Sequence, residues 1–329
     1  MAAPNSRHTD PARARNSEAG FSLAELMVAS ALFLIISSIV TQALLQMSNA
    51  QRTIWNRTEM HSGVRSATEL LQQEVGQAGR VAVPSAITIP GGAALGANQA
   101  TLNSVNGLYV GELIVVDGGA NQETAVISAI TTATKVITIS KVVDNDGNQT
   151  GTVFANAHAA GAAVNVYGGF QTGVIPPLAA PVNFANGSTP SILKMYGDVN
   201  GDGSMVYVEY TCDTANGYLY RNSMPFDQTT AKVAAGPSQI LLTNITTNPG
   251  GTACFQYQMD AANQFVLDVA VTLTVNTQQI DPITRQVQQE TKALLNVSPR
   301  NVMDAWELHG HSYGSRVQPT PTTVTALLP

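Results

Sequence analysis

The feature that most constrains this chain is a long uncharged and apolar segment close to its N-terminus. No charged residue occurs in residues 26–51, and residues 26–45 are almost wholly apolar. A helix rises about 1.5 Å per residue, so about 20 apolar residues cross the hydrocarbon core of a bilayer. Ser37, Ser38 and Thr41 fall within the run, but their hydroxyls can bond to the helix backbone. The segment therefore predicts one membrane-spanning helix.

Residues 1–20, which precede the span, are polar and contain Arg7, Arg13 and Arg15. Positive charge ahead of a span predicts an N-terminus in the cytoplasm and the bulk of the chain outside. A secretory signal peptide, the competing interpretation, would have a shorter apolar region followed by a small-residue cleavage site. It would also give no reason for Glu25, because a carboxylate in lipid is costly unless it is paired. The pattern favours a membrane anchor in which Glu25 has a specific function.

Residues 20–27, Gly-Phe-Ser-Leu-Ala-Glu-Leu-Met, resemble the type IV prepilin motif. In that family a polar leader ends in glycine, phenylalanine is the first mature residue, and glutamate is the fifth. The resemblance implies cleavage after Gly20 by a prepilin peptidase and N-methylation of Phe21. It also implies that Glu25 pairs with the N-terminal amine of a neighbouring subunit during assembly. Ala19 departs from the family, where a basic residue is common, and the leader is rather long.

The helical pattern continues beyond the membrane segment. Apolar residues recur at steps of three and four, and charged residues lie largely on other faces. We therefore expect one helix over about residues 22–77, ended by Gly76, Gly79 and Pro84, with its second half packed on a globular head. The apolar positions are Met60, Val64, Ala67, Leu71, Val75 and Ala78. The charged positions are Arg57, Glu59, Arg65, Glu69 and Glu74.

The rest of the chain is rich in Gly, Ala, Val, Thr and Asn, which suits short strands separated by turns. The expected fold class is α+β, with a long N-terminal helix packed on a β-rich pilin head that carries an inserted small β module. The expected parts are a leader (1–20), a spine helix (21–80), the inserted module (81–177), the head sheet (178–302) and a mobile C-terminal tail (303–329). The expected strands are 108–116, 123–130, 135–142, 163–167, 206–211, 217–221, 239–244, 252–259, 265–275 and 286–295.

Several short motifs of the head follow one another in the order found in minor pilins of the PilW type. They occupy residues 197–203, 208–210, 217–221, 240–245, 254–257 and 297–302. The chain therefore resembles PilW-type minor pilins over about its first 80 residues and from about residue 190 to residue 302. The module in between lies outside this resemblance.

A second distinctive motif, at residues 198–209, fits the spacing of a calcium-binding loop. Its expected ligands for Ca²⁺ are Asp198, Asn200, Asp202, a carbonyl near Ser204, and Glu209. The alternative is an Asp/Asn/Gly turn that leads into a strand and needs no metal. Residues 205–210 alternate like a strand and not like the exit helix of an EF-hand, so Glu209 would point with Tyr207.

Cysteine and histidine give three smaller indications. Cys212 and Cys254 are the only cysteines, and an even count in an exported chain favours one disulfide over two buried thiols. His158 is better interpreted as a structural histidine than as a ligand. His309 and His311 are better interpreted as a solvated pair than as a metal site.

Composition and motifs argue against two broad classes of function. The net charge is −6 and no long basic block occurs, so nucleic-acid binding has little support. No nucleophile elbow, phosphate-binding loop or metalloprotease motif occurs with the strand and helix context that it needs. We therefore expect neither an enzyme nor a nucleic-acid-binding protein.

The resemblance implies a minor type IV pilin with a single span in the inner membrane and its head outside. The protein would then be incorporated in, or prime, a pilus filament at the cell surface, where the head serves assembly or adhesion. Its expected partners are other pilin subunits, reached through the N-terminal helix, the prepilin peptidase and the inner membrane. Two alternatives stay open: a minor pseudopilin of a type II secretion system, and a calcium-dependent surface adhesin.

Overall fold

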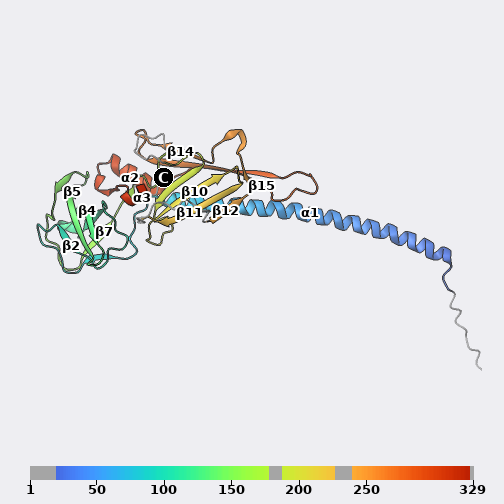
Figure 1. Ribbon diagram of the computed structural model, residues 1–329, viewed down its shortest axis with the longest axis horizontal. Helices are drawn as coiled ribbons and strands as arrows, with labels where there is room; N and C mark the ends of the chain where they lie inside the picture. The colour runs from blue at the N-terminus through green and yellow to red at the C-terminus, as the bar shows by residue number, and fades with distance from the viewer. Residues whose placement is uncertain (1–19, 178–186, 227–238, 327–329) are drawn as a thin grey trace, which may run out of the picture. The chain divides into compact units, whose positions relative to one another are not determined.

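Figure 1 shows the computed structural model, which describes residues 20–177, 187–226 and 239–326. Apart from Gly20, the expected leader lies outside the described residues. The chain divides into two compact units, one that ends at Ile54 and one that begins at Trp55. A long N-terminal helix followed by a β-rich head confirms the expected α+β class.

Helix α1 (Leu23–Gln77) is a single element of 55 residues, as the apolar pattern predicts. Beyond the helix, Gly79 has a φ of +81° and donates its N–H to the carbonyl of Tyr196 at 2.9 Å. A Cβ at Gly79 would lie 2.9 Å from the side chain of Val302. The conformation and the close packing both favour glycine as the helix stop. The buried apolar residues of α1 are the expected ones: Met60, Val64, Ala67, Leu71 and Val75.

The head contains two four-stranded antiparallel sheets within the described residues. Their strands are β9 (Ile192–Gly197), β10 (Val206–Asp213), β11 (Tyr218–Pro225), β12 (Gln239–Thr243), β13 (Ile245–Thr246), β14 (Phe255–Met259), β15 (Val266–Asn276) and β16 (Gln289–Val297). One sheet has the order β12-β11-β10-β9. In the other, β15 pairs with β13 and β14 along one edge and with β16 along the opposite edge. Val208, Val271 and Leu71 share one core, so both sheets pack against α1.

The inserted module is a sheet of seven strands with a core of its own. Its strands are β1 (Ile87–Ile89), β2 (Gln99–Thr101), β3 (Leu113–Val116), β4 (Glu123–Thr131), β5 (Val136–Val143), β6 (Gln149–Gly151) and β7 (Ala162–Val166). The order is β1-β7-β3-β4-β5-β2, and β6 also pairs with β5. The four strands expected here are present, but β3 begins at Leu113 and not at residue 108. Gly111 has a φ of +98°, which turns the chain just before the strand.

The module ends earlier than the expected boundary at residue 177. Strand β8 (Gly169–Phe170) leaves the module and pairs in parallel with β17 (Val317–Gln318). Phe170 donates its N–H to the carbonyl of Gly79 at 2.9 Å, and Val174 is buried in the core that α1 shares with the sheets. A bridge joins Arg80 to Gly169, so the chain enters and leaves the module at one point.

The expectation of a tail from residue 303 onward is wrong, because residues 300–326 belong to the folded head. They form α2 (Arg300–Gly310), β17 and α3 (Thr322–Ala326), and Val302 and Val324 are buried. Gln318 is fully buried, and its side chain accepts the N–H of Leu113 at 2.9 Å and donates to the carbonyl of Leu113 at 2.8 Å. Its amide therefore satisfies the backbone of β3 and joins the C-terminal segment to the module.

A buried ion pair links α1 to the sheet. Nη2 and Nε of Arg221 on β11 lie 2.6 Å and 3.0 Å from Oε1 of Glu74. The hydroxyl of Tyr210 donates to the second oxygen of Glu74 at 2.6 Å. Burial and the Glu74 carboxylate raise the pKa of Tyr210, so its hydroxyl remains a donor at neutral pH. These contacts supply hydrogen bonds and an opposite charge to Glu74, the one carboxylate that α1 buries.

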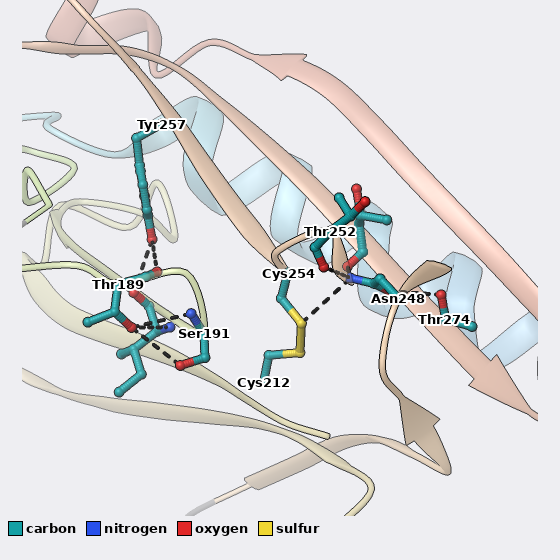
Figure 2. The surroundings of a disulfide bond; sticks show 10 residues. Thr189, Ser191, Cys212, Asn248, Thr252, Cys254, Tyr257 and Thr274 are labelled. Carbon is teal, nitrogen blue, oxygen red and sulfur yellow. Dashed lines mark hydrogen bonds between the residues drawn. A yellow bond between two sulfur atoms is a disulfide. The ribbon is translucent and has the colours of Figure 1, made fainter. Parts of the chain in front are cut away.

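The expected disulfide is confirmed. Cys212 on β10 bonds to Cys254, which lies just before β14, and so it joins the two sheets of the head (Figure 2). Asn248 lies beside the disulfide and donates to the carbonyls of Thr252 and Thr272 at 3.1 Å and 2.8 Å. The bond therefore sits in a region whose buried polar groups are paired.

Candidate processing and assembly site

The N-terminal motif lies at the very start of α1. Gly20 and Phe21 are exposed and precede the helix. The N–H of Ser22 donates to Oε2 of Glu25 at 2.9 Å, and the N–H of Glu25 donates to Oγ of Ser22 at 3.2 Å. This reciprocal pair is a capping box, which satisfies two backbone donors at the helix start. The spacing Ser-x-x-Glu is visible in the sequence, but only Glu25 was singled out from it.

The N-terminal part of α1 exposes apolar side chains on all sides. α1 is long and apolar enough to cross a membrane, and nothing in its most apolar stretch is buried. A helix that is hydrophobic all round and unburied needs lipid or other helices around it. The large exposed residues are Phe21, Leu23, Leu26, Met27, Val28, Leu32, Phe33, Leu34, Ile35, Ile36, Ile39, Val40, Leu44, Leu45 and Met47.

Residues 15–41 match a family model described as the prokaryotic N-terminal methylation motif. This match, together with the long N-terminal apolar helix, supports a type IV pilin-like protein. The motif implies processing by prepilin peptidase, and with the single apolar helix it indicates a single-pass membrane anchor for this pilin-like protein. No curated protein and no solved structure matched the chain.

The expected calcium ligands lie on the turn between β9 and β10 and, for Glu209, on β10 itself. The carboxylate of Asp198 is buried and accepts the N–H groups of Asp202 and Gly203 at 3.0 Å and 3.2 Å. Nε of Arg80 lies 3.6 Å from the same carboxylate. Asp202 in turn accepts the N–H of Ser204 at 2.8 Å. Asp198 therefore neutralises a guanidinium and closes its own turn, as the alternative interpretation expects.

Glu209 lies on β10, where its register partner is Lys194 of β9. It is buried and accepts a hydrogen bond from the hydroxyl of Tyr207 at 3.0 Å. Across the part of the chain that the structure describes, no three His, Cys, Asp or Glu side chains gather as a metal site would need. The calcium assignment of residues 198–209 stays a prediction, and His309 and His311 join no such group among the described residues.

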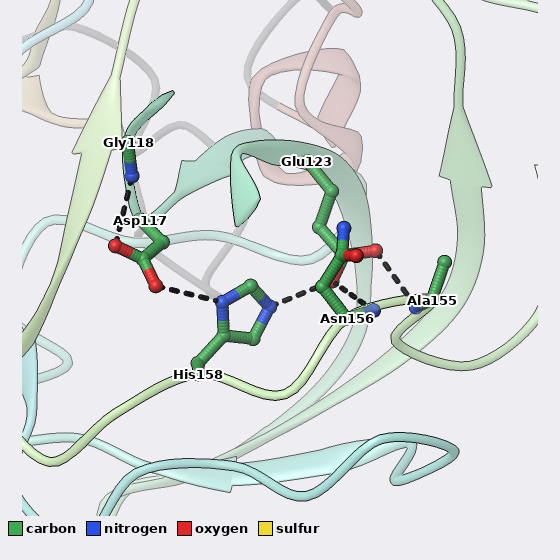
Figure 3. A network of polar contacts seen from close by, with 6 residues as sticks. All are labelled: Asp117, Gly118, Glu123, Ala155, Asn156 and His158. Carbon is green, nitrogen blue, oxygen red and sulfur yellow. Dashed lines mark hydrogen bonds and ion pairs between the residues drawn. The ribbon is translucent and has the colours of Figure 1, made fainter. Parts of the chain in front are cut away.

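His158 of the inserted module lies between two carboxylates (Figure 3). Its Nε2 is 2.6 Å from Oε1 of Glu123, and its Nδ1 is 3.3 Å from Oδ2 of Asp117. Glu123 also accepts the N–H groups of Ala155 and Asn156 at 2.9 Å and 3.2 Å. The Gly118 N–H and then the His158 ring lower the pKa of Asp117. The network ties the loop before β7 to both ends of the β3–β4 turn, which fits a structural histidine.

Glu112, just before β3, is a buried carboxyl group that the sequence did not single out. Its Oε2 accepts the N–H of Tyr109 at 3.1 Å, whereas Oε1 has no hydrogen-bond partner. Burial raises the pKa of Glu112 well above its ordinary value. The folded protein therefore retains a proton on Glu112 at a pH where the unfolded chain has released it.

We expect the head to lose stability as pH rises above about 4.5, the ordinary pKa of a glutamate. While only the folded state holds the proton, the slope is about 1.4 kcal/mol per pH unit. Glu112→Gln keeps an oxygen for the Tyr109 N–H and cannot titrate. The free energy of unfolding, measured between pH 4.5 and 7, should therefore fall less steeply in the variant. Parallel curves for the two proteins would contradict the assignment.

Proposed function

We propose that this chain is a minor pilin of the PilW type, built into a type IV pilus filament or priming its assembly. The observation that carries the proposal is the methylation motif placed at the start of one uninterrupted helix, α1. A cleaved leader would leave Phe21 as a new cationic terminus four residues from Glu25, and both charges then need partners in lipid. A bundle of such helices from several subunits supplies those partners.

The construction of the head supports a low-copy position in the filament. Beyond two sheets packed on α1, it carries the seven-stranded module with its separate core. A subunit that repeats along a filament favours a compact head, whereas a tip or priming subunit has room for an added domain. We propose that the head acts in assembly or adhesion and has no catalytic role.

A minor pseudopilin of a type II secretion system would share the motif, the helix and the anchor. The two candidates differ in what deletion of the gene removes. A minor pilin is needed for surface pili, and a pseudopilin is needed for the export of secreted proteins. Pilus counts and secreted-protein profiles of one deletion strain therefore separate them.

The test of the proposal is the mature N-terminus. In cells with prepilin peptidase we expect mass spectrometry to find a chain that begins with N-methylated Phe21. In cells without the peptidase, or with Gly20→Glu at the cleavage site, the leader should remain. An intact leader in peptidase-containing cells, or cleavage beyond the apolar span, would overturn the pilin assignment.

Glu25→Ala should leave cleavage intact and abolish incorporation into filaments, because the buried terminus of a neighbour loses its partner. Glu18→Ala is the matched control, since this carboxylate is removed with the leader. Sheared surface filaments, probed for the chain, give the readout. Equal incorporation of both variants would argue against an assembly role for Glu25.

A further inference from the structure

The loop between β15 and β16, residues 277–288, is held against α1 in the folded unit that begins at Trp55. Asn56 donates its side-chain amide to the carbonyl of Gln279 at 3.5 Å, and Arg57 donates to the side-chain oxygen of Gln288. The hairpin runs beside α1 in Figure 1. Val275, at the end of β15, lines the same hollow as Met60. The hairpin therefore contacts α1 at Asn56 and Arg57, close to the start of this unit.

The tip is a well-defined turn. Asp281 is buried, and its Oδ1 accepts the N–H groups of Ile283 and Thr284 at 2.7 Å and 3.1 Å. Arg285 donates its N–H to the carbonyl of Asp281 at 2.8 Å. The Asp281 carboxylate and backbone groups form this turn, so the turn does not depend on the neighbouring side chains.

These side chains are large and apolar. Ile280, Ile283 and Val287 are 64%, 63% and 50% exposed, and Trp55, next to Asn56, is 75% exposed. A single exposed isoleucine is ordinary on a protein surface, but three large apolar residues on one short turn indicate a contact surface. We call Ile280, Ile283 and Val287 the tip patch.

The position of the tip patch along the chain indicates what covers it. Trp55 follows Leu45, the end of the apolar run, by ten residues, or about 15 Å of helix. Arg57 and Arg285 are exposed beside the apolar residues, and cations of this kind bind lipid phosphates. Tryptophan favours the same interfacial layer of a bilayer.

We propose that the tip patch docks on the surface of the bilayer that anchors the protein, with its apolar side chains in the headgroup layer. This contact sets the orientation of the head relative to the bilayer before the subunit enters a filament. The proposal rests on the single-pass anchor and is independent of which filament the subunit joins. In an assembled filament the same patch would have to leave the lipid.

The disulfide uses both native cysteines, so one added cysteine can be labelled selectively. We would attach a nitroxide at Ile283→Cys in the full chain, reconstituted in vesicles of phosphatidylcholine and phosphatidylglycerol. Leu95→Cys in the inserted module is the matched control, because Leu95 is also a large exposed residue, at 67%. The readout is the ratio of collision rates with oxygen, which partitions into lipid, and with a water-soluble nickel complex.

We expect a several-fold higher ratio at residue 283 than at residue 95. Adding Ile280→Glu and Val287→Glu should bring the ratio at 283 down to the value at 95, while carbonate extraction still leaves the chain in the membrane. Equal ratios at the two positions in the otherwise native chain would overturn the proposal. Protection of residue 283 only in assembled filaments would overturn it too, and would assign the patch to a neighbouring subunit.

Discussion

Glu74→Ala is expected to destabilise the head by about 3–5 kcal/mol, the cost of removing one member of a buried ion pair. Arg221 is largely buried and makes its bidentate contact with Glu74, and Tyr210 loses the acceptor of its hydroxyl as well. Because the pair joins α1 to β11, removing it weakens the packing of the helix on the sheet. Urea unfolding of the detergent-solubilised chain, followed by circular dichroism, measures it.

Glu69→Ala is the matched control for this prediction. Glu69 lies on the same helix and pairs with Arg65 at 2.7 Å, but both side chains are mostly exposed. Water screens such a pair, so its loss should change stability little. The double variant Glu74→Met/Arg221→Met removes both charges and should recover part of the lost stability. If Glu74→Ala unfolded at the same urea concentration as Glu69→Ala, the buried pair would not hold the helix to the sheet.

Removing the disulfide is expected to cost a similar amount. Cys212 and Cys254 are 42 residues apart, and the entropy lost by closing a loop of that length raises the free energy of the unfolded chain by about 4 kcal/mol. The double variant Cys212→Ala/Cys254→Ala should therefore lower the Tm of the head by about 10 °C. Differential scanning calorimetry of the oxidised protein and the variant gives the comparison.

Reduction provides an independent control for the disulfide. Dithiothreitol should lower the Tm of the native chain to about that of the double variant and should leave the variant unchanged. An oxidised native chain that melts with the variant would show that the bond adds nothing to stability. Asn248, packed beside the sulfurs, should keep its bonds to the backbone in both forms.

The parts of the fold that were predictable have a strong repeating pattern. α1 combines an apolar run with a stripe at steps of three and four, and its bounds agree with the expectation within a residue. Strand β10 alternates and much of β15 is β-branched, as expected of strands. Strand β9 was missed, because Lys194 interrupts a short apolar run and looks like a surface residue. Its position opposite Glu209 explains how the sheet accommodates the charge.

The C-terminal segment could not be predicted from local pattern. Val317 and Gln318 form a strand only because β8, about 150 residues earlier, pairs with them. Gln318 is polar, and its burial depends on the backbone of Leu113, which no local signal reveals. A proline- and threonine-rich sequence therefore resembled a tail. Glu74 was likewise assigned to an outer face, although its partner Arg221 comes from a distant strand.

At the candidate site, sequence was informative where the chemistry is local. Gly20, Phe21 and Glu25 lie within six consecutive residues, so the motif can be recognised without knowledge of the fold. The calcium motif is not local in this sense, because its ligands would have to converge from a loop and a strand. Asp198 instead meets Arg80, which lies more than 100 residues earlier in the chain.

The single point at which the chain enters and leaves the inserted module has a consequence for how such a protein diversifies. Since Arg80 and Gly169 are bridged, the parts of the module that do not contact the rest of the head can lengthen, shorten or be exchanged without moving the ends of the flanking segments. The outer surface of the module can therefore change without a change in the two sheets that pack on α1. Gln318 sets one condition on this freedom: any replacement must offer its amide a strand backbone, as Leu113 does now.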